Sequence, residues 1–309
     1  MPRTYKLDSD AVHYAWDNAL PPRLHVDSGD TVIISCRDSS DGRYRRGMTT
    51  ADMRPYTAKG HPLTGPIAVR DAHPADVLQI DVLDLVPGEV GYTSFVPGRG
   101  LLPDDFPRPY LKMWELDGRF AELRSGIRIP LEPFLGVMGV AVTEPGEHST
   151  IPPRAQGGNM DVKQLTKGST LYLPIQVVGA LFSAGDGHAA QGDGEVCITA
   201  IETTMTATLR LSVVRDHAIE GPQFKTNALA SRTVAGGHYA TMGIAPDLME
   251  ASRSAVRSMI GHLVDARGLT REEAYVLCSV AVDLKISEVV DAPNWVVSAF
   301  LPLAIFEST

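Results

Sequence analysis

Residues 157–202, GGNMDVKQLTKGSTLYLPIQVVGALFSAGDGHAAQGDGEVCITAIE, alternate glycine-rich acidic turns with apolar and β-branched runs. The runs STLYLPIQV (169–177) and EVCITAIETTMTATLRLSVV (195–214) have the composition typical of β-strands. We expect the second run to form a long hairpin or a pair of strands. Glycine permits the backbone angles that tight turns between strands require. This stretch therefore predicts a β fold with a dense set of acidic side chains in its turns.

The rest of the chain extends this β pattern and adds helices only near its end. Apolar runs at 30–36, 65–70 and 76–86, followed by another from residue 134, are short strands at the spacing of a sandwich or barrel. We expect an N-terminal β-rich part over 1–130. A second part over 131–309 would carry the acidic turns and a C-terminal helical pair, and the two parts would form one compact unit.

Two helices are predicted near the C-terminus by their capping residues. Asp247 can cap a helix that Gly268 ends, and the apolar residues between them fall on one stripe. Thr270 and Glu273 have the spacing of a capping box for a second helix. The tail NWVVSAFLPLAIF (294–306) is then a last strand that packs back on the sheet. The chain should be mainly β, with a smaller C-terminal α/β portion.

Composition excludes several classes of protein. The 309 residues are 44% hydrophobic and 21% charged, as in an ordinary globular protein. A net charge of -9 with scattered Lys and Arg argues against a nucleic-acid partner, and no run approaches the roughly 18 apolar residues of a membrane helix. The start MPRTYKLDSD has no apolar signal segment, and three distant cysteines, Cys36, Cys197 and Cys278, fit reduced thiols. We expect a cytoplasmic protein whose partner is a small neutral molecule.

The acidic turns contain a candidate metal site. Asp186 and His188 are two residues apart, so they share one face of an extended backbone. With Asp161 from the first turn, they form a His and carboxylate set of the kind that binds Zn²⁺ and leaves a position open for water; Asp193 could replace Asp186 as a ligand. Zn²⁺ is the expected divalent ion, and Ca²⁺ is the alternative. The competing interpretation is that Gly-Asp-Gly is ordinary turn chemistry and a lone histidine is structural.

Other side chains of the stretch could take part in catalysis. Glu202 or Glu195 could accept a proton from the attacking water, and Asn159 could stabilise an oxyanion. Alternatively, Glu195 is a solvated turn residue and Glu202 a charge at a strand edge. A thiol nucleophile at Cys197, with Lys163 upstream, is discounted because a cysteine between Val196 and Ile198 is most simply a small core residue.

Substrate-binding residues are predicted at two places. His13 and Trp16 are three residues apart and could project into a pocket, although an aromatic plug over a sheet end is the default for such a pair. Gln191, in the second acidic turn, is the third residue that we expect to contact substrate. His61 has no partner that the sequence identifies, so a surface or core-filling role is its default.

Several of these segments, taken together, closely resemble the acetamidase/formamidase family. The matching segments run in order from about residue 13 to 305, and they are HYAWDNALPP, SGDTV, GPIAV, GVMGVA, PGEHSTIPP, GGNMDVKQLTKGSTLYLP, GALFSAGDGHAAQGDGEVCITAIE and AYVLCSVAVDLKISEVVDAPNWVV. The paired GGNMD and GDGHAAQGDGE motifs are the most specific. Two segments depart from the family pattern, HPAD at 73–76 and the Ala155-Gln156 pair before Gly157.

The resemblance implies jelly-roll-like β-sandwich parts, a cytoplasmic homo-oligomer, and hydrolysis of formamide, acetamide and similar linear amides to carboxylate and ammonia. The family pattern carries over eight positions: Asn159, Asp161, Asp186, His188, Gln191, Asp193, Glu195 and Glu202. We expect a metal-activated water to attack the amide. Two alternatives remain, a hydrolase of cyclic or larger amides such as a γ-lactam, and a non-catalytic jelly-roll module that binds a structural Ca²⁺.

Overall fold

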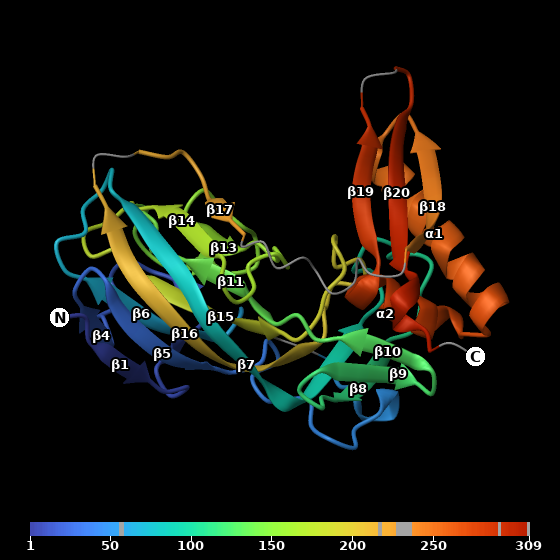
Figure 1. Cartoon of the computed structure of the whole chain (residues 1–309), viewed down its shortest axis with the longest axis horizontal. Helices are drawn as coiled ribbons and strands as arrows, with labels where there is room; N and C mark the ends of the chain where they lie inside the picture. Colours follow the sequence, from blue (N-terminus) through green and yellow to red (C-terminus); the bar gives the residue numbers. More distant parts are fainter. Residues whose placement is uncertain (56–58, 216–217, 227–236, 290–291, 308–309) are drawn as a thin grey trace.

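The chain folds around one large β-sheet, with a smaller α/β portion at its C-terminal end (Figure 1). The computed structural model describes residues 1–55, 59–215, 218–226, 237–289 and 292–307. Within these ranges a 13-stranded sheet is accompanied by two 2-stranded sheets and one 3-stranded sheet, and the helices α1 and α2 lie near the C-terminus. The predicted mainly β class, with sandwich parts and a C-terminal helical pair, is confirmed.

The strands of the large sheet come from most of the chain. They are β1 (Thr4–Leu7), β2 (Val12–His13), β4 (Leu24–Val26), β5 (Asp30–Cys36), β6 (Leu63–Val69), β7 (Val77–Phe95), β8 (Tyr110–Glu115), β11 (Phe134–Gly139), β13 (Gly157–Asn159), β14 (Thr170–Pro174), β15 (Phe182–His188), β16 (Glu202–Val214) and β17 (Gln223–Lys225). Strands from both sides of residue 130 therefore pair in one sheet.

Small elements complete this half of the molecule. They are β3 (Ala15–Trp16), which pairs with β12 (His148–Ser149); the hairpin of β9 (Phe120–Arg124) and β10 (Ile127–Pro130); and the 3₁₀ helix η1 (Thr50–Asp52). Strand β5 alternates buried and half-buried residues, as period-two patterning requires. Long β7 pairs with β16 along its first part and with β8 at its far end, so it connects the large sheet to the region under the helices (Figure 1).

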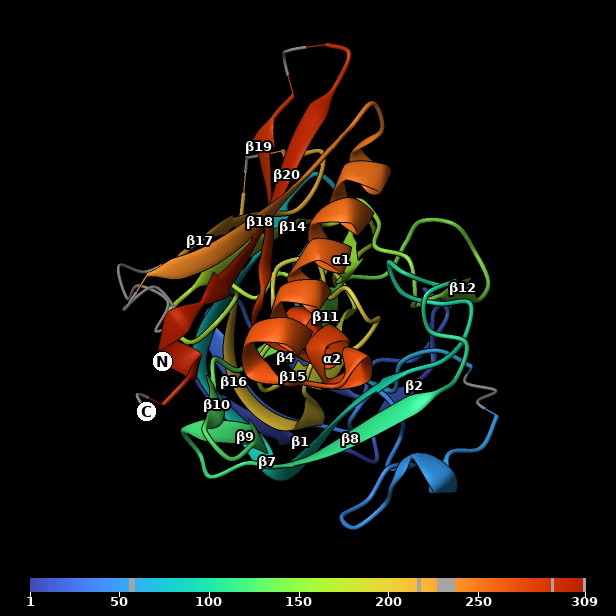
Figure 2. The ribbon, with the colours of Figure 1, turned by 90° about the vertical axis from the view of Figure 1, so that its right-hand side faces the viewer.

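The C-terminal portion packs its helices on a small antiparallel sheet. Helix α1 (Leu248–Arg267) begins after Asp247, whose side chain accepts a hydrogen bond from the Glu250 backbone, and ends at Gly268 with φ 59°. Helix α2 (Arg271–Ala281) begins with the predicted capping box of Thr270 and Glu273. Figure 2 shows α1 lying along the sheet formed by β18 (His238–Ala245), β20 (Trp295–Pro302) and β19 (Asp283–Glu288). A 3₁₀ helix, η3 (Leu303–Ile305), follows.

Two sequence-based expectations about strands near the site are wrong. The run 195–214 does not form the expected long hairpin or pair of strands; it contains a single strand, which begins only at Glu202. The segment before it is a turn that packs on α2, where the Cys197 backbone N–H donates to Ser279 Oγ at 3.1 Å and Tyr275 donates to the Val196 carbonyl. Its apolar side chains thus enter the helical core, which periodicity alone could not distinguish from a strand.

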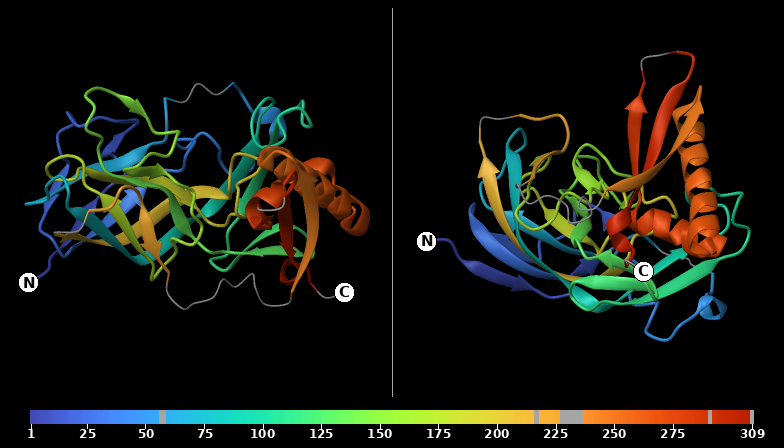
Figure 3. Two further views of the ribbon diagram at one scale, coloured as in Figure 1. Left: turned by 90° about the horizontal axis from the view of Figure 1, so that it is seen from above. Right: turned by 45° about the vertical axis from the view of Figure 1, so that its right-hand side comes forward.

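The second correction concerns Asp186-Gly187-His188, which ends strand β15 and is not a turn. It is held on both sides because β15 pairs with β11 and β6 along its length and with β16 at its end. In the part of the chain that the structure describes, no helix combines the length and apolar character that a membrane span requires. All three cysteines are buried and free. Figure 3 shows the same arrangement from above, with the termini at opposite ends.

Candidate metal centre and active site

The site is built around His188, the last residue of β15, which is fully buried. Glu202, the first residue of β16, lies directly opposite it in the antiparallel register, and Phe134 of β11 lies opposite on the other side. Directly opposed residues of an antiparallel pair project to the same face. The Phe134 ring meets the imidazole edge-on, with 4.9 Å between ring centroids. Strand pairing therefore fixes the imidazole between an aromatic ring and a carboxylate.

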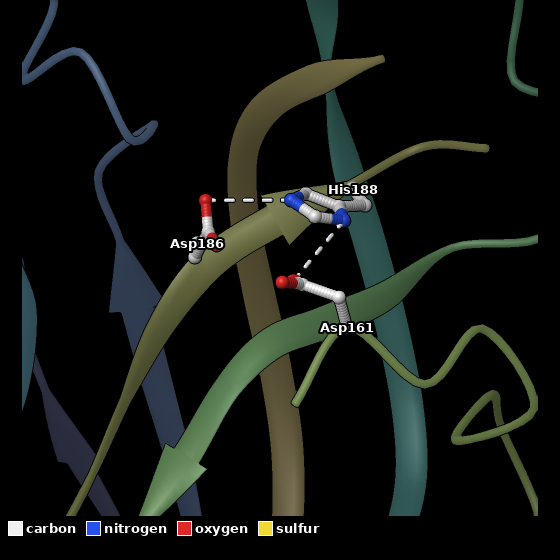
Figure 4. A group of neighbouring side chains, drawn as sticks. All are labelled: Asp161, Asp186 and His188. Atoms are coloured by element: carbon white, nitrogen blue, oxygen red, sulfur yellow. Dashed lines mark ion pairs between the residues drawn. The ribbon is translucent and has the colours of Figure 1, made fainter. Parts of the chain in front are cut away.

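Four carboxylates surround this imidazole. Its Nε2 atom lies 3.3 Å from Glu202 Oε1, 3.4 Å from Asp186 Oδ1 and 3.9 Å from Glu195 Oε1. Its Nδ1 atom lies 4.0 Å from Asp161 Oδ1. Figure 4 shows the Asp186 and Asp161 carboxylates approaching the ring from two different segments. The structure thus gathers five of the residues that the sequence singled out.

Backbone conformation helps to aim these carboxylates. Asp161, Asp186 and Glu195 have φ of 51°, 59° and 41°, in the left-handed region that non-glycine residues seldom occupy. Each such residue costs on the order of 1–3 kcal/mol, and such residues cluster at functional sites. Three of the five residues are therefore held in strained conformations by the fold around them.

Gly136, in the middle of β11, makes room for the cluster. A Cβ atom there would lie 2.6 Å from Asp161 Oδ1, 2.7 Å from Asp186 Oδ2 and 3.0 Å from His188 Cε1. Any side chain at this position would push the ligating groups apart. Our sequence analysis did not identify Gly136, although a glycine inside an apolar strand is a signal of close approach.

The donor atoms of the cluster fit a divalent cation. Asp161 Oδ1, Asp186 Oδ1 and His188 Nε2 are buried and have no hydrogen-bond partner in the part of the chain that the structure describes. An unsatisfied buried polar atom costs about 1–3 kcal/mol, and more when it is charged. Two overlapping sets of three residues have their ligand atoms within 4.8 Å of one another: Asp161, Asp186 and His188, and His188, Glu195 and Glu202. Carboxylate oxygens and one imidazole nitrogen are ligands that Zn²⁺ and related ions accept.

Gln191 fixes the tautomer of His188. Its Nε2 donates to the Asp161 carbonyl at 2.8 Å, so its Oε1 faces His188 Nδ1 at 2.9 Å and must accept from it. In the neutral ring the proton then sits on Nδ1, and Nε2 keeps the lone pair that a metal needs. Gln191 thus contacts both His188 and the Asp161 backbone. It is not among the residues that line the cavity described below, and its contact with substrate stays a prediction.

Burial and mutual charge shift the pKa values of the cluster. Burial raises the pKa of Asp161 to about 7 and also raises those of Glu195 and Glu202. Burial opposes the ionisation of Asp186 as well, but the neighbouring imidazoles of His188 and His61 outweigh it and lower the pKa of that carboxyl. For His188, burial disfavours the imidazolium, yet the Glu202 and Asp186 carboxylates prevail and raise its pKa well above the usual range.

The cluster opens on one side into a cavity of about 420 Å³. Its polar lining contains Asn159, Asp161, Asp186, Glu195 and Glu202, together with residues that the sequence analysis did not select: Ser39, Tyr92 and His61. Ser39 Oγ donates to Glu202 Oε2 at 2.7 Å and lies 2.6 Å from the Tyr92 hydroxyl. These residues lie far from 157–202 in sequence, and no local pattern marked them.

His61 approaches the cluster from the cavity side. Its Nε2 atom lies 3.9 Å from Asp186 Oδ2, and its Nδ1 atom lies 3.2 Å from Thr150 Oγ1. The Thr150 hydroxyl also accepts the His61 backbone N–H at 2.8 Å, so its own proton is available to Nδ1. In a neutral ring this arrangement places the remaining proton on Nε2, toward the cavity. His61 was expected to have a surface or core-filling role, whereas the structure places it as a polar group of the site.

Three predicted site residues lie elsewhere. His13 bonds to the Ala15 carbonyl and to Ser183 Oγ, each at 2.8 Å, and Trp16 packs with Leu63 and Val137 in a small buried cluster. Neither is among the residues that line the cavity, so their contact with substrate stays a prediction.

The third, Asp193, is absent from both groups of possible metal ligands among the described residues. Its carboxylate accepts a hydrogen bond from Gln164 Nε2 at 3.2 Å. Asp193 lies apart from the possible ligands because its loop turns away from His188 toward the C-terminal strand β19. There the Asp193 backbone N–H donates to the Asp283 carboxylate at 3.1 Å.

The chain is similar to several known amide hydrolases. The chain is 27% identical to a formamidase of Methylophilus methylotrophus over 96% of this chain and 89% of that protein. An acetamidase of Mycolicibacterium smegmatis is 29% identical over 60% of this chain and 61% of its own length. Among solved structures, a γ-lactamase from Delftia acidovorans superimposes with a TM-score of 0.91 at 25% identity, covering 99% of this chain and 94% of that one.

An acetamidase from Bacillus halodurans superimposes with a TM-score of 0.67 at 32% identity, covering 97% of both chains. The sequence profile of the Acetamidase/Formamidase family matches residues 2–148 and 144–308, which is nearly the whole chain. With the buried His188 cluster in place, this match establishes that the chain belongs to the acetamidase/formamidase family.

Proposed function

We propose that this protein is an amidase that hydrolyses short linear amides, such as formamide and acetamide, to a carboxylate and ammonia with the help of a divalent metal ion. Its relatives named formamidase and acetamidase support the reaction class. The observation that carries the proposal is the set of unpaired buried atoms of Asp161, Asp186 and His188 beside an open cavity.

Asp161, Asp186 and His188 would hold the ion, with Glu202 beside them. When bound, a divalent ion supplies Lewis acidity, which polarises the amide carbonyl and lowers the pKa of water. His188 would offer its Nε2 lone pair because Gln191 keeps the proton on Nδ1. The buried carboxylates would have to be ionised to act as ligands, so metal binding would release their protons.

Glu195 is the proton acceptor that we favour over Glu202. Both Glu202 oxygens already accept hydrogen bonds, from the Ala200 backbone at 3.0 Å and from Ser39 at 2.7 Å. Among the described residues, the Glu195 carboxylate accepts none, and it lines the cavity. Burial raises its pKa, which brings a carboxylate closer to the value that a general base needs near neutral pH.

Two further groups would act on the amide itself. Asn159 Nδ2 donates one N–H to the Ile151 carbonyl at 3.0 Å, which leaves its second N–H to stabilise the developing oxyanion. His61 Nε2–H would hydrogen-bond to the departing nitrogen, and the proton that Glu195 takes from the water would pass to that nitrogen, so that ammonia is the leaving group. The atoms balance, since water supplies the hydroxyl of the new acid and the proton that Glu195 accepts.

The remaining properties follow from the donor set and the family resemblance. We take the ion to be Zn²⁺ because the set includes an imidazole; Ca²⁺ would rely on oxygen ligands alone and would not require His188. We also place the enzyme in the cytoplasm as a homo-oligomer with no nucleic-acid or membrane partner. A second candidate function is γ-lactam hydrolysis, which the TM-score of 0.91 to a γ-lactamase favours.

Ammonia release from formamide, acetamide, propionamide and a γ-lactam tests these alternatives, before and after chelation. We expect turnover of the linear amides that chelation abolishes and Zn²⁺ restores, and a His188→Ala variant that retains neither metal nor activity. Turnover of the γ-lactam alone would select the second function. Full metal content and no change of turnover in His188→Ala would contradict the metal mechanism.

A further inference from the structure

We propose that the preferred substrates are amides whose acyl group is an extended apolar chain, longer than that of acetamide, bound along an apolar wall of the cavity. This inference rests on the proposed amidase function and concerns the substrate class of the same site. Besides polar residues, the cavity lining includes Tyr44, Phe95, Val96, Ile151 and Ile198. We call these five residues the acyl wall.

The cavity is much larger than the smallest amides require. Formamide and acetamide have only three and four non-hydrogen atoms, whereas the cavity measures about 420 Å³. Cavities of roughly 300–1,000 Å³ are those that enclose drug-sized ligands. An amide held at the metal cluster would therefore leave most of the acyl wall in contact with water unless its acyl group extended along it.

Three members of the acyl wall are unusually exposed for their type. Val96, Ile151 and Ile198 are 36%, 52% and 40% exposed. All three residues line the same cavity, so their exposure is not scattered over the protein. A grouped apolar surface beside polar groups is typical of a ligand-binding site.

Two members of the acyl wall are tied directly to catalytic residues. Ile198 closes a turn with Glu195, since its backbone N–H donates to the Glu195 carbonyl at 2.8 Å. Ile151 is tied to Asn159, whose side chain donates to its carbonyl at 3.0 Å. These hydrogen bonds connect the polar and apolar parts of the cavity. The acyl wall therefore starts next to the groups that would act on the amide carbon.

The backbone of Ile198 is also strained. Its φ of 77° lies in the left-handed region, where a β-branched residue is a genuine outlier. Glycine or asparagine would occupy that conformation at lower cost. Strain of this kind persists where the surrounding structure enforces it, and it concentrates at ligand-binding positions. Here it presents a large apolar side chain to the cavity.

The test is a series of linear primary amides from formamide to hexanamide, measured as ammonia release by the metal-loaded enzyme. A fully buried methylene strengthens binding about fourfold. Since the acyl wall is open on one side, we expect kcat/KM to rise about twofold to fourfold for each methylene beyond acetamide. In Ile198→Ala and Ile151→Ala this dependence on chain length should become flatter.

The control is Ile286→Ala, because Ile286 is 63% exposed on β19 and does not line the cavity. It should keep the wild-type dependence on chain length, and thermal melting should show all three variants folded. If formamide and acetamide are hydrolysed but kcat/KM falls with every added methylene, the acyl-wall inference is wrong and the amidase function stands. An unchanged slope in both acyl-wall variants would also overturn it. If no amide is hydrolysed, the proposed function itself fails.

Discussion

The tripeptide Gly-Asp-Gly occurs twice, at residues 185–187 and 192–194, and the structure uses the two copies in different ways. The first copy lies within β15, where the Asp186 side chain is only 4% exposed and lies 3.4 Å from His188 Nε2. The second copy lies in a loop, where Asp193 accepts from Gln164. Local chemistry is the same in both, so the difference comes from what each copy packs against.

The second copy forms backbone hydrogen bonds with the C-terminal portion. The Gly192 backbone N–H donates to the Ser279 carbonyl of α2 at 2.8 Å, and the Leu284 backbone N–H donates to the Asp193 carbonyl at 3.0 Å. Next to this contact, Lys163 forms a half-buried ion pair with Asp283. We therefore assign the first Gly-Asp-Gly to the proposed metal centre and the second to docking of the C-terminal portion.

The largest expected difference is between Asp186→Asn and Asp193→Asn. Asp186→Asn removes a charged ligand, and because the cluster acts as a unit, amide hydrolysis should fall by about a thousandfold or more. Asp193→Asn alters a polar contact outside the cluster, so activity should stay within about threefold of wild type. Ammonia release and metal content per chain measure both effects. Similar losses in the two variants would contradict the assignment.

Gly192→Ala should disrupt docking. A Cβ atom there would lie 2.1 Å from the Val282 carbonyl oxygen and 2.8 Å from the Val282 nitrogen, so backbone would have to move. Overpacking of this kind costs about 1–3 kcal/mol, and we expect the upper part of that range in the free energy of unfolding measured with denaturant.

The matched control for Gly192→Ala is Gly261→Ala. Gly261 lies inside α1, with nothing within 4 Å of the added Cβ, so alanine there should stabilise by up to about 1 kcal/mol. If Gly192→Ala is as stable as wild type, the close contact between the second copy and Val282 does not hold.

Two glutamines allow a finer comparison. Gln191 bonds to His188, next to the first Gly-Asp-Gly, and Gln164 bonds to Asp193 in the second. Gln191→Ala removes the hydrogen bond that sets the His188 tautomer, and Zn²⁺ affinity should fall about 10-fold to 100-fold. Gln164→Ala removes the hydrogen bond to Asp193 and should leave Zn²⁺ affinity unchanged. Competition with a chelator of known affinity measures both. Equal affinities in wild type and Gln191→Ala would refute the positioning role.

The smallest expected effect is a pH dependence of stability in the metal-free protein. Burial raises the pKa of Asp161 from 3.8 to about 7, and the pKa of His188 is also raised. In each case the folded state binds the proton more tightly than the unfolded chain, so this stabilisation is present at low pH and is lost as pH rises through the folded-state pKa. Tm after chelation should therefore fall by a few degrees between pH 5.5 and 8.5.

Variants connect this pH effect to the Asp161 carboxyl in the cluster around His188. Asp161→Asn should flatten the fall in Tm, because it removes the carboxyl whose pKa is about 7, whereas Asp193→Asn should leave the fall as in wild type. Saturating Zn²⁺ should oppose the fall, since bound metal favours the ionised ligands. Thermal melting at several pH values measures these changes in Tm. If the Tm of the metal-free protein rises between pH 5.5 and 8.5, the predicted sign of the pH dependence is wrong.

Much of the fold could be predicted because it depends on local signals. Asp247 and Gly268 marked the ends of α1, and Thr270 with Glu273 marked the start of α2, because capping depends on residues only a few positions apart. The run 30–36 gave β5 with the predicted bounds. The run from 195 failed because Val196 and Cys197 satisfy a strand pattern and a helix-packing turn equally well.

The candidate site was only partly predictable. Asp161, Asp186 and His188 were recognised from residue type and spacing, and the structure brings them together. His61 and Ser39 were not recognised, because each reaches the cluster from a loop more than a hundred residues away in sequence. His13 and Trp16 were placed in the pocket because spacing shows that two side chains share a face but not what covers that face.

The sequence by itself determined a mainly β chain with two capped C-terminal helices and a set of acidic residues around one histidine, since composition, periodicity and capping act over a few residues. Only the tertiary structure decided which Gly-Asp-Gly faces His188 and which one fastens the C-terminal portion. It also decided that a cavity with an apolar wall lies beside the cluster. Both outcomes depend on pairing between β15, β16 and distant loops, and those through-space contacts leave no pattern in the local sequence.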